Sequence, residues 1–228
     1  MPSTVVHVAF AWLLAAGLLR DHFDRRALGL IAAVVVLADL DAFAGLLVES
    51  THRALLHTAL LPLAAGALVR WDLRRPDSRI RERYGDWGAE VFPVTVVCFA
   101  VAAIGLDLAT AGGVNLFYPV YDQFVSVSGE LGYATREGFF QTFVEVTGSQ
   151  APASGGGGGA GSTQPRIDVG QQGSTREHHV GSGIDPEKGV ETGDVRRTFP
   201  VFYRGWHLLL TVASLLAVAV RLRDRQPP

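Results

Sequence analysis

Five apolar runs occupy much of this 228-residue chain, and they limit what it can fold into. They are residues 2–19, 27–48, 54–69, 91–110 and 201–220. A helix needs about 20 apolar residues to cross the hydrocarbon core of a membrane, because each residue adds about 1.5 Å. A soluble domain carries about 25% charged residues, whereas only 18% of these residues are charged. The sequence therefore predicts an all-α membrane protein with about five transmembrane helices.

Arginine gathers in three short stretches, at residues 20–26, 70–86 and 221–225. Basic residues in short loops stay on the cytoplasmic side of a membrane. The three stretches share one side if all five runs span and the amino terminus lies outside. We therefore expect an integral protein of the plasma membrane with the amino terminus out and the carboxyl terminus cytoplasmic.

The remaining polar segments divide the chain further. Two runs, 124–128 and 140–146, alternate weakly between apolar and polar residues, which predicts short strands in an outer-face hairpin or interfacial cap. Half of the 26 glycines lie in one later stretch with few apolar residues, which predicts a disordered loop with solvated histidines at 178 and 179. The predicted units are a transmembrane core (1–120), an outer-face interfacial segment (121–147), the Gly-rich loop (148–198), and a last helix with a basic tail (199–228).

Six ionisable residues lie within or at the ends of the apolar runs, where a charged side chain costs a few kcal/mol. In the expected topology all six lie toward the outer face. Imidazole nitrogens and carboxylate oxygens are the ligands of zinc, and a shared aspartate can bridge two metals. The sequence thus predicts a divalent metal site, with zinc expected and manganese the other option. The candidate ligands are His7, Asp39, Asp41, His52 and His57, with Asp107 beside them.

The spacing of these residues limits how they meet. Positions five apart on a helix diverge by about 140°, so His52 and His57 converge best if His52 precedes a helix and His57 lies one turn into it. Asp39 and Asp41 would point to nearly opposite sides of a helix. One of them can bind metal while the other orients a histidine, and either assignment is open.

Four motifs in this order resemble YdjM-like proteins, which are membrane-bound and regarded as metal-dependent hydrolases distantly similar to zinc phospholipase C and P1-type nucleases. The motifs are the early His7, the pair Asp39-Leu40-Asp41, the run His52-Arg53-Ala54-Leu55-Leu56-His57-Thr58, and Asp107 followed by Gly113-Val114-Asn115-Leu116-Phe117-Tyr118-Pro119. The resemblance covers about residues 1–120. It implies a membrane-bound metal-dependent hydrolase, which the expected topology would place with its site at the outer face.

The sequence departs from the family pattern at two positions. The family has a histidine four residues before the late aspartate, where this chain has Ala103, and a proline before the Asp-x-Asp pair, where it has Ala38. Asn115 or His207 could complete a ligand set that lacks the histidine.

Two functions follow from these observations. The first is hydrolysis of a phosphoester, such as that of a membrane lipid, with Asp107 as ligand or general base and Arg53 binding the anionic oxygen. The alternative is a non-catalytic membrane protein whose cluster holds a structural metal or conducts ions or protons. Membrane lipids are the expected partners. The net charge of −2 gives no reason to expect nucleic acid.

Overall fold

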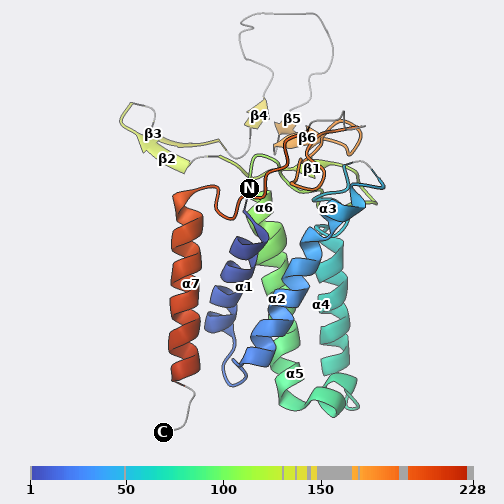
Figure 1. Ribbon diagram of the computed structural model, residues 1–228, viewed down its shortest axis with the longest axis vertical. Helices are drawn as coiled ribbons and strands as arrows, with labels where there is room; N and C mark the ends of the chain where they lie inside the picture. Colours follow the sequence, from blue (N-terminus) through green and yellow to red (C-terminus); the bar gives the residue numbers. More distant parts are fainter. Residues whose placement is uncertain are drawn as a thin grey trace, which may run out of the picture.

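The computed structural model describes residues 2–48, 50–129, 131–136, 138–142, 145–147, 166–168, 170–189 and 195–224. Within these residues the long helices lie side by side, and short strands gather over one end of the bundle (Figure 1). We call this end the cap end. The amino terminus lies at the cap end and the carboxyl terminus at the opposite end.

The helices alternate in direction along the bundle. They are α1 (Thr4–Leu18), α2 (Arg25–Asp39), the short α3 (Asp41–Ala44), α4 (Leu60–Leu73), α5 (Arg79–Cys98) with its continuation through the π-helix η1 (Phe99–Gly105) and α6 (Leu106–Leu108), and α7 (Gly205–Arg223). The connections α1–α2 and α4–α5 and the end of α7 all lie opposite the cap end (Figure 1). The three arginine-rich stretches therefore share one end of the bundle, as the sequence predicts.

Three segments of the described chain are long and apolar enough to cross a membrane. They are Arg25–Ala44, Arg79–Leu108 and Gly205–Arg223, while α1 is a shorter apolar helix. This confirms the prediction of a helical protein with membrane-spanning helices. The total of five spans stays a prediction.

The third predicted helix begins later than its apolar run. The run starts at residue 54, but α4 begins at Leu60, so His57 lies before the helix and not one turn into it. The N–H groups of Arg53 and Leu56 donate to the carboxylate of Asp41, at 3.0 and 3.4 Å. These side-chain bonds compete with helical hydrogen bonds, which explains why the helix cannot start here.

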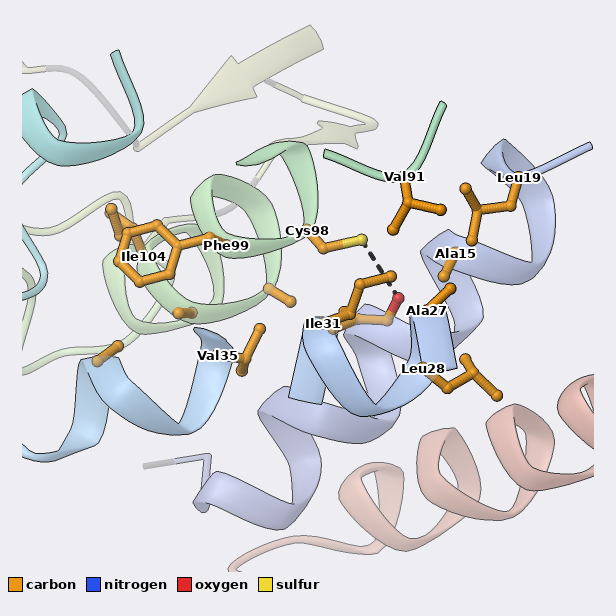
Figure 2. Close-up of a cluster of buried hydrophobic side chains, with 14 of the residues drawn as sticks. Ala15, Leu19, Ala27, Leu28, Ile31, Val35, Val91, Cys98, Phe99 and Ile104 are labelled. Atoms are coloured by element: carbon orange, nitrogen blue, oxygen red, sulfur yellow. Dashed lines mark hydrogen bonds between the residues drawn. The ribbon is translucent and has the colours of Figure 1, made fainter. Parts of the chain in front are cut away.

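The core lies where α1, α2 and α5 with η1 meet (Figure 2). Small buried residues such as Ala11, Ala15 and Ala27 let the helices approach closely, as in other membrane bundles. The thiol of Cys98 points into this contact and donates to the carbonyl oxygen of Ala11 at 3.4 Å. Ala103 is fully buried in the same cluster, so its position in η1 belongs to the apolar core.

The cap contains one local hairpin, of the kind expected for this part of the chain, and two pairings between segments further apart in the sequence. β1 (Phe124–Val125) pairs with β6 (Gln171–Gly173), β2 (Leu131–Ala134) with β3 (Gly138–Gln141), and β4 (Glu145–Thr147) with β5 (Arg166–Asp168), all antiparallel. A cap with strands is therefore present, but the described residues of runs 124–128 and 140–146 do not pair with each other. The partner of β1 comes from the Gly-rich loop. That pairing is non-local, and alternation within a run says nothing about which strand it meets.

Part of the Gly-rich loop is ordered against the cap, so the prediction of disorder is wrong for residues 170–189. The carboxylate of Asp122 accepts hydrogen bonds from Thr175 N (3.0 Å) and Thr175 Oγ1 (2.7 Å). Burial raises the pKa of Asp122, but its hydrogen bonds with Thr175 and Asn115 outweigh burial and hold that pKa below its ordinary value. His178, predicted to be solvated, is half-buried and lies 3.1 Å by Nε2 from the carbonyl oxygen of Gly112. Residues 148–165 and 190–194 lie outside the described chain.

Candidate functional site

Asp41 joins two histidines at the cap end of the bundle. It is the first residue of α3 and fully buried. Its Oδ1 accepts a hydrogen bond from His52 Nδ1 (2.9 Å), and its Oδ2 accepts one from His57 Nδ1 (2.8 Å). Because an ionised carboxylate only accepts, both rings donate from Nδ1. Their Nε2 atoms are therefore left for other partners.

A break between α2 and α3 places Asp39 and Asp41 on two sides of one ring. Leu40 N bonds to the carbonyl oxygen of Leu37 at 3.2 Å, an i to i−3 contact that tightens the chain here. Asp41 then faces His57 Nδ1, while Asp39 Oδ1 lies 3.7 Å from His57 Nε2. The two aspartates thus lie near opposite nitrogens of the same imidazole.

The Nε2 edge of the His57 ring lies near a second group of side chains. Asp107 Oδ2 lies 3.3 Å from His57 Nε2, and Asp107 Oδ1 lies 3.3 Å from His7 Nε2. Asp39 Oδ1 lies 3.6 Å from His7 Nδ1. We call His7, Asp39, His57 and Asp107 the inner quartet. Its members come from α1, the end of α2, the segment before α4, and α6.

Three of the four ring nitrogens of the inner quartet are buried without hydrogen bonds to the described residues. Within the described residues, His7 Nδ1, His7 Nε2 and His57 Nε2 have no hydrogen-bond partner. Their distances to carboxylate oxygens exceed the roughly 2.7–3.0 Å of a charge-assisted bond. Two ligands of one tetrahedral zinc lie about 3.3–3.5 Å apart, because each is about 2.0–2.1 Å from the metal. The donor types of the quartet and the two 3.3 Å contacts of Asp107 are therefore compatible with a metal, whereas the two contacts of Asp39 are too long.

The quartet as it stands is not a closed coordination shell. In the part of the chain that the structure describes, no group of three or more His, Cys, Asp or Glu side chains is arranged so that it could hold a metal ion. The two contacts of Asp39, at 3.6 and 3.7 Å, are the longest in the quartet. Its side chain is also the most exposed of the four, at 20%.

Arg53 is buried beside the quartet in an unusual backbone conformation. Its Nη2 donates to Asp107 Oδ1 (2.5 Å) and its Nη1 to Thr110 Oγ1 (2.8 Å). Its φ is +61°, in the left-handed region, which costs a non-glycine residue about 1 kcal/mol or more. The N–H of Asn115 holds the Arg53 carbonyl at 2.9 Å. Such strain persists where surrounding contacts demand it, and here those contacts direct the guanidinium to Asp107.

The electrostatics of the cluster call for compensating positive charge. With the histidines neutral, the three carboxylates of Asp39, Asp41 and Asp107 against one Arg53 leave a formal charge of −2. Burial disfavours the charged form of His57, but Asp107 and Asp41 on its two sides outweigh burial and raise its pKa to about 10. Two protons or one divalent cation would neutralise the cluster. The protons or the cation would lie beside the ring nitrogens that have no hydrogen-bond partner among the described residues.

A cleft of about 290 Å³ opens onto the cluster. His7, Asp39, His52, Arg53 and Asp107 line its polar side. The start of the chain, the loop at residues 181–184 and the segment at 198–203 form the rest of the wall. The polar groups are therefore reachable from outside the bundle although most of them are buried.

The structure brings together every residue that the sequence singles out as a ligand or catalytic group. Thr4 is an additional contributor, since its hydroxyl donates to Asp39 Oδ2. A threonine at the start of an apolar run carries no sequence signal for such a part. Asn115 and His207 do not join the quartet: Asn115 Nδ2 donates to Asp122 (2.7 Å), and His207 Nδ1 accepts from Tyr203 N (3.3 Å).

Comparison with known proteins identifies one family. The family model described as YdjM inner membrane protein matches residues 1–159. This match contains the inner quartet, Asp41, His52 and Arg53. No curated protein and no solved structure matches the chain significantly.

Proposed function

The chain belongs to the YdjM inner membrane protein family, and we propose that it is a metal-dependent hydrolase acting on phosphoesters at the membrane surface. Family membership and the apolar helices indicate a plasma-membrane location. The observation that carries the proposal is the inner quartet. Two buried imidazoles and two carboxylates converge there, and three of the four ring nitrogens have no hydrogen-bond partner among the described residues.

The inner quartet is the proposed ligand set. His7 and His57 supply nitrogen, and Asp39 and Asp107 supply oxygen, which are the donor types that zinc and manganese accept. When bound, the metal would lower the pKa of a water molecule and polarise the phosphoryl group. Asp41 and His52, which the sequence also offers as ligands, take other parts in this proposal.

Asp41 is the proposed positioning residue for both histidines. Its carboxylate holds Nδ1 of His57 and thereby directs Nε2 into the quartet. Ligating histidines commonly donate their other nitrogen to a carboxylate in this way, which fixes the ring and raises its basicity. Its second oxygen holds His52 in the same tautomer at the wall of the cleft. His52 can therefore accept a proton at Nε2 and is the proposed general base.

Arg53 is the proposed anchor of Asp107 and a contact for the substrate. Its Nη groups are engaged by Asp107 and Thr110, so it holds one ligand in place. Its Nε has no hydrogen-bond partner among the described residues, and the residue lines the cleft. One donor thus remains for an anionic oxygen of a phosphoester.

The first test of this function is the metal content of the purified full-length protein. Elemental analysis is expected to find about one zinc or manganese per chain. A strong chelator should abolish hydrolysis of bis(p-nitrophenyl) phosphate and of phospholipids in micelles, and added zinc should restore it. Activity that survives removal of the metal would contradict the proposal.

A second candidate is a pathway for protons or ions. It is favoured by one observation, that two protons on His7 and His57 would neutralise the cluster as well as a divalent cation would. Its support in the sequence is Ala103 in place of the family histidine. A protein without bound metal, in which Asp39 is needed for proton uptake into vesicles, would favour this candidate over hydrolysis.

The proposed topology has five spans with the cap end outside. It is supported by the three arginine-rich ends that lie opposite the cap. The native Cys98 is buried, so single cysteines at exposed sites can report orientation. In intact cells, a membrane-impermeant maleimide should label Val120→Cys in the cap and not Asp77→Cys before α5. The reverse pattern would place the site on the cytoplasmic side.

A further inference from the structure

An apolar groove runs along the side of the helical bundle between α2 and α4. Both helices pack against α5, which lies behind them (Figure 1). The groove has a volume of about 360 Å³. Its walls include Leu30 and Val34 from α2, Leu61 and Ala65 from α4, and Val96 and Phe99 from α5 and η1. Figure 2 shows Phe99 pointing away from Cys98 and the contact of α5 with α1, so this side chain is free to form a wall.

The groove is open because α4 carries small side chains where it faces the neighbouring helices. Ala65 is exposed on this wall. The next residue, Gly66, approaches Val96, whose Cγ1 would lie 3.5 Å from a Cβ at position 66. The groove includes one polar side chain, that of Thr95, whose hydroxyl donates to the carbonyl oxygen of Val91 in its own helix. The groove therefore offers no group that needs water.

Two features relate the groove to the membrane and to the site. It extends along α4 from Leu61 to Val69, about 12 Å at 1.5 Å per residue. That length is close to the depth of one leaflet, about 15 Å, or half of a hydrocarbon core about 30 Å thick. Its upper end, at Leu61 and Pro62, follows His57 by four and five residues. A chain lying in the groove would thus end at the start of α4, which directly follows the segment that carries His57.

We propose that this groove holds one acyl chain of the lipid whose phosphoester is presented to the site. Two of its walls, α2 and α5, belong to segments long and apolar enough to span a membrane, so its occupant is hydrocarbon and not a soluble partner. The proposal rests on the proposed function for the phosphoester, but retention of the acyl chain does not require hydrolysis. It explains how a site at the end of a bundle would take a substrate that stays in the membrane.

The experiment uses the full-length protein in nanodiscs that contain a phosphatidic acid with a diazirine at the middle of one acyl chain. After irradiation, the labelled peptides are mapped by mass spectrometry. Label is expected on α2, α4 and α5 around the groove, several times more than on exposed residues of α7 such as Leu209 and Leu216. Equal labelling of all lipid-facing helices would mean ordinary surrounding lipid and would overturn the proposal.

A matched pair of substitutions on α4 tests the groove itself. Ala65→Trp fills it, whereas Ala67→Trp adds the same side chain at an exposed position outside the lining. Labelling around the groove should fall by at least about fivefold in the first variant, since an acyl segment loses its buried area, and should not change in the second. Val34→Trp fills the groove from α2 and serves if Ala65→Trp does not fold. Equal labelling in the filled and control variants would overturn the proposal.

Activity measurements separate this inference from the proposed function. Ala65→Trp should hydrolyse a long-chain phospholipid at least about fivefold more slowly and a soluble dihexanoyl analogue at the wild-type rate. Groove labelling without any hydrolysis by the wild type would leave the acyl site standing and remove the hydrolase proposal. Hydrolysis without preferential labelling of the groove would remove the acyl site and leave the hydrolase proposal standing.

Discussion

Replacement of His57 by alanine is expected to remove the bound metal and to lower phosphoester hydrolysis by about 10³-fold or more, since metal catalysis supplies several kcal/mol. His57 is the residue that connects the two halves of the site. Its Nδ1 donates to Asp41, and its Nε2 faces both Asp39 and Asp107. Removing the ring therefore deletes one ligand and leaves the carboxylate of Asp41 with one imidazole fewer.

Elemental analysis of detergent-purified His57→Ala beside the wild type measures this effect. The matched control is His22→Ala, because His22 pairs with Glu90 at 2.6 Å at the opposite end of the bundle. The control should keep its metal and its activity. Millimolar imidazole should restore part of the metal content of His57→Ala if the lost group is a ligand. A full complement of metal in His57→Ala would exclude the quartet as the binding site.

Replacement of Arg53 by methionine is expected to lower the free energy of unfolding by about 3–5 kcal/mol, as when one partner of a buried ion pair is removed. Arg53 and Asp107 are both about 1% exposed, and they contact each other at 2.5 Å. Without the guanidinium, the buried carboxylate of Asp107 has no arginine partner. The measurement is thermal unfolding in detergent after treatment with chelator, so that bound metal does not compensate for the lost charge.

Two further variants show whether the pair causes the loss. The double variant Arg53→Met, Asp107→Leu should be more stable than Arg53→Met alone, because neither buried charge is then left unpaired. Arg81→Met breaks an exposed pair with Asp86 and should change stability by no more than about 0.5 kcal/mol. If Arg53→Met unfolds at the wild-type temperature, the pair contributes nothing and the φ of +61° has another cause.

The extents of the helices show which features are local in the sequence. The apolar runs at 2–19 and 201–220 become α1 and α7 within a few residues, because hydropathy over one segment decides whether it can form an apolar helix. The first six residues of the run at 54–69 are not part of a helix. The N–H of Arg53, just before the run, and that of Leu56, within it, bond to Asp41, which is distant in the sequence and leaves no trace in the hydropathy of the run.

The cap shows a second feature that a local reading of the sequence does not predict. The Gly-rich composition of residues 148–198 predicts disorder, yet residues 170–189 are held by side-chain bonds to Asp122 and to the backbone at Gly112. These contacts are polar and few, and each joins residues more than 50 positions apart. Composition averages over a segment and does not register them.

The sequence by itself determined that polar residues would meet at one end of a helical membrane protein. A histidine or an aspartate in an apolar run is costly, and alternating helices bring such residues to a common depth. Only the tertiary structure determined which partner each of these residues contacts. The turn at Leu40 sends Asp39 and Asp41 to opposite nitrogens of His57, and the left-handed conformation of Arg53 brings its guanidinium to Asp107. Both conformations depend on contacts between distant segments, so no local pattern could specify them.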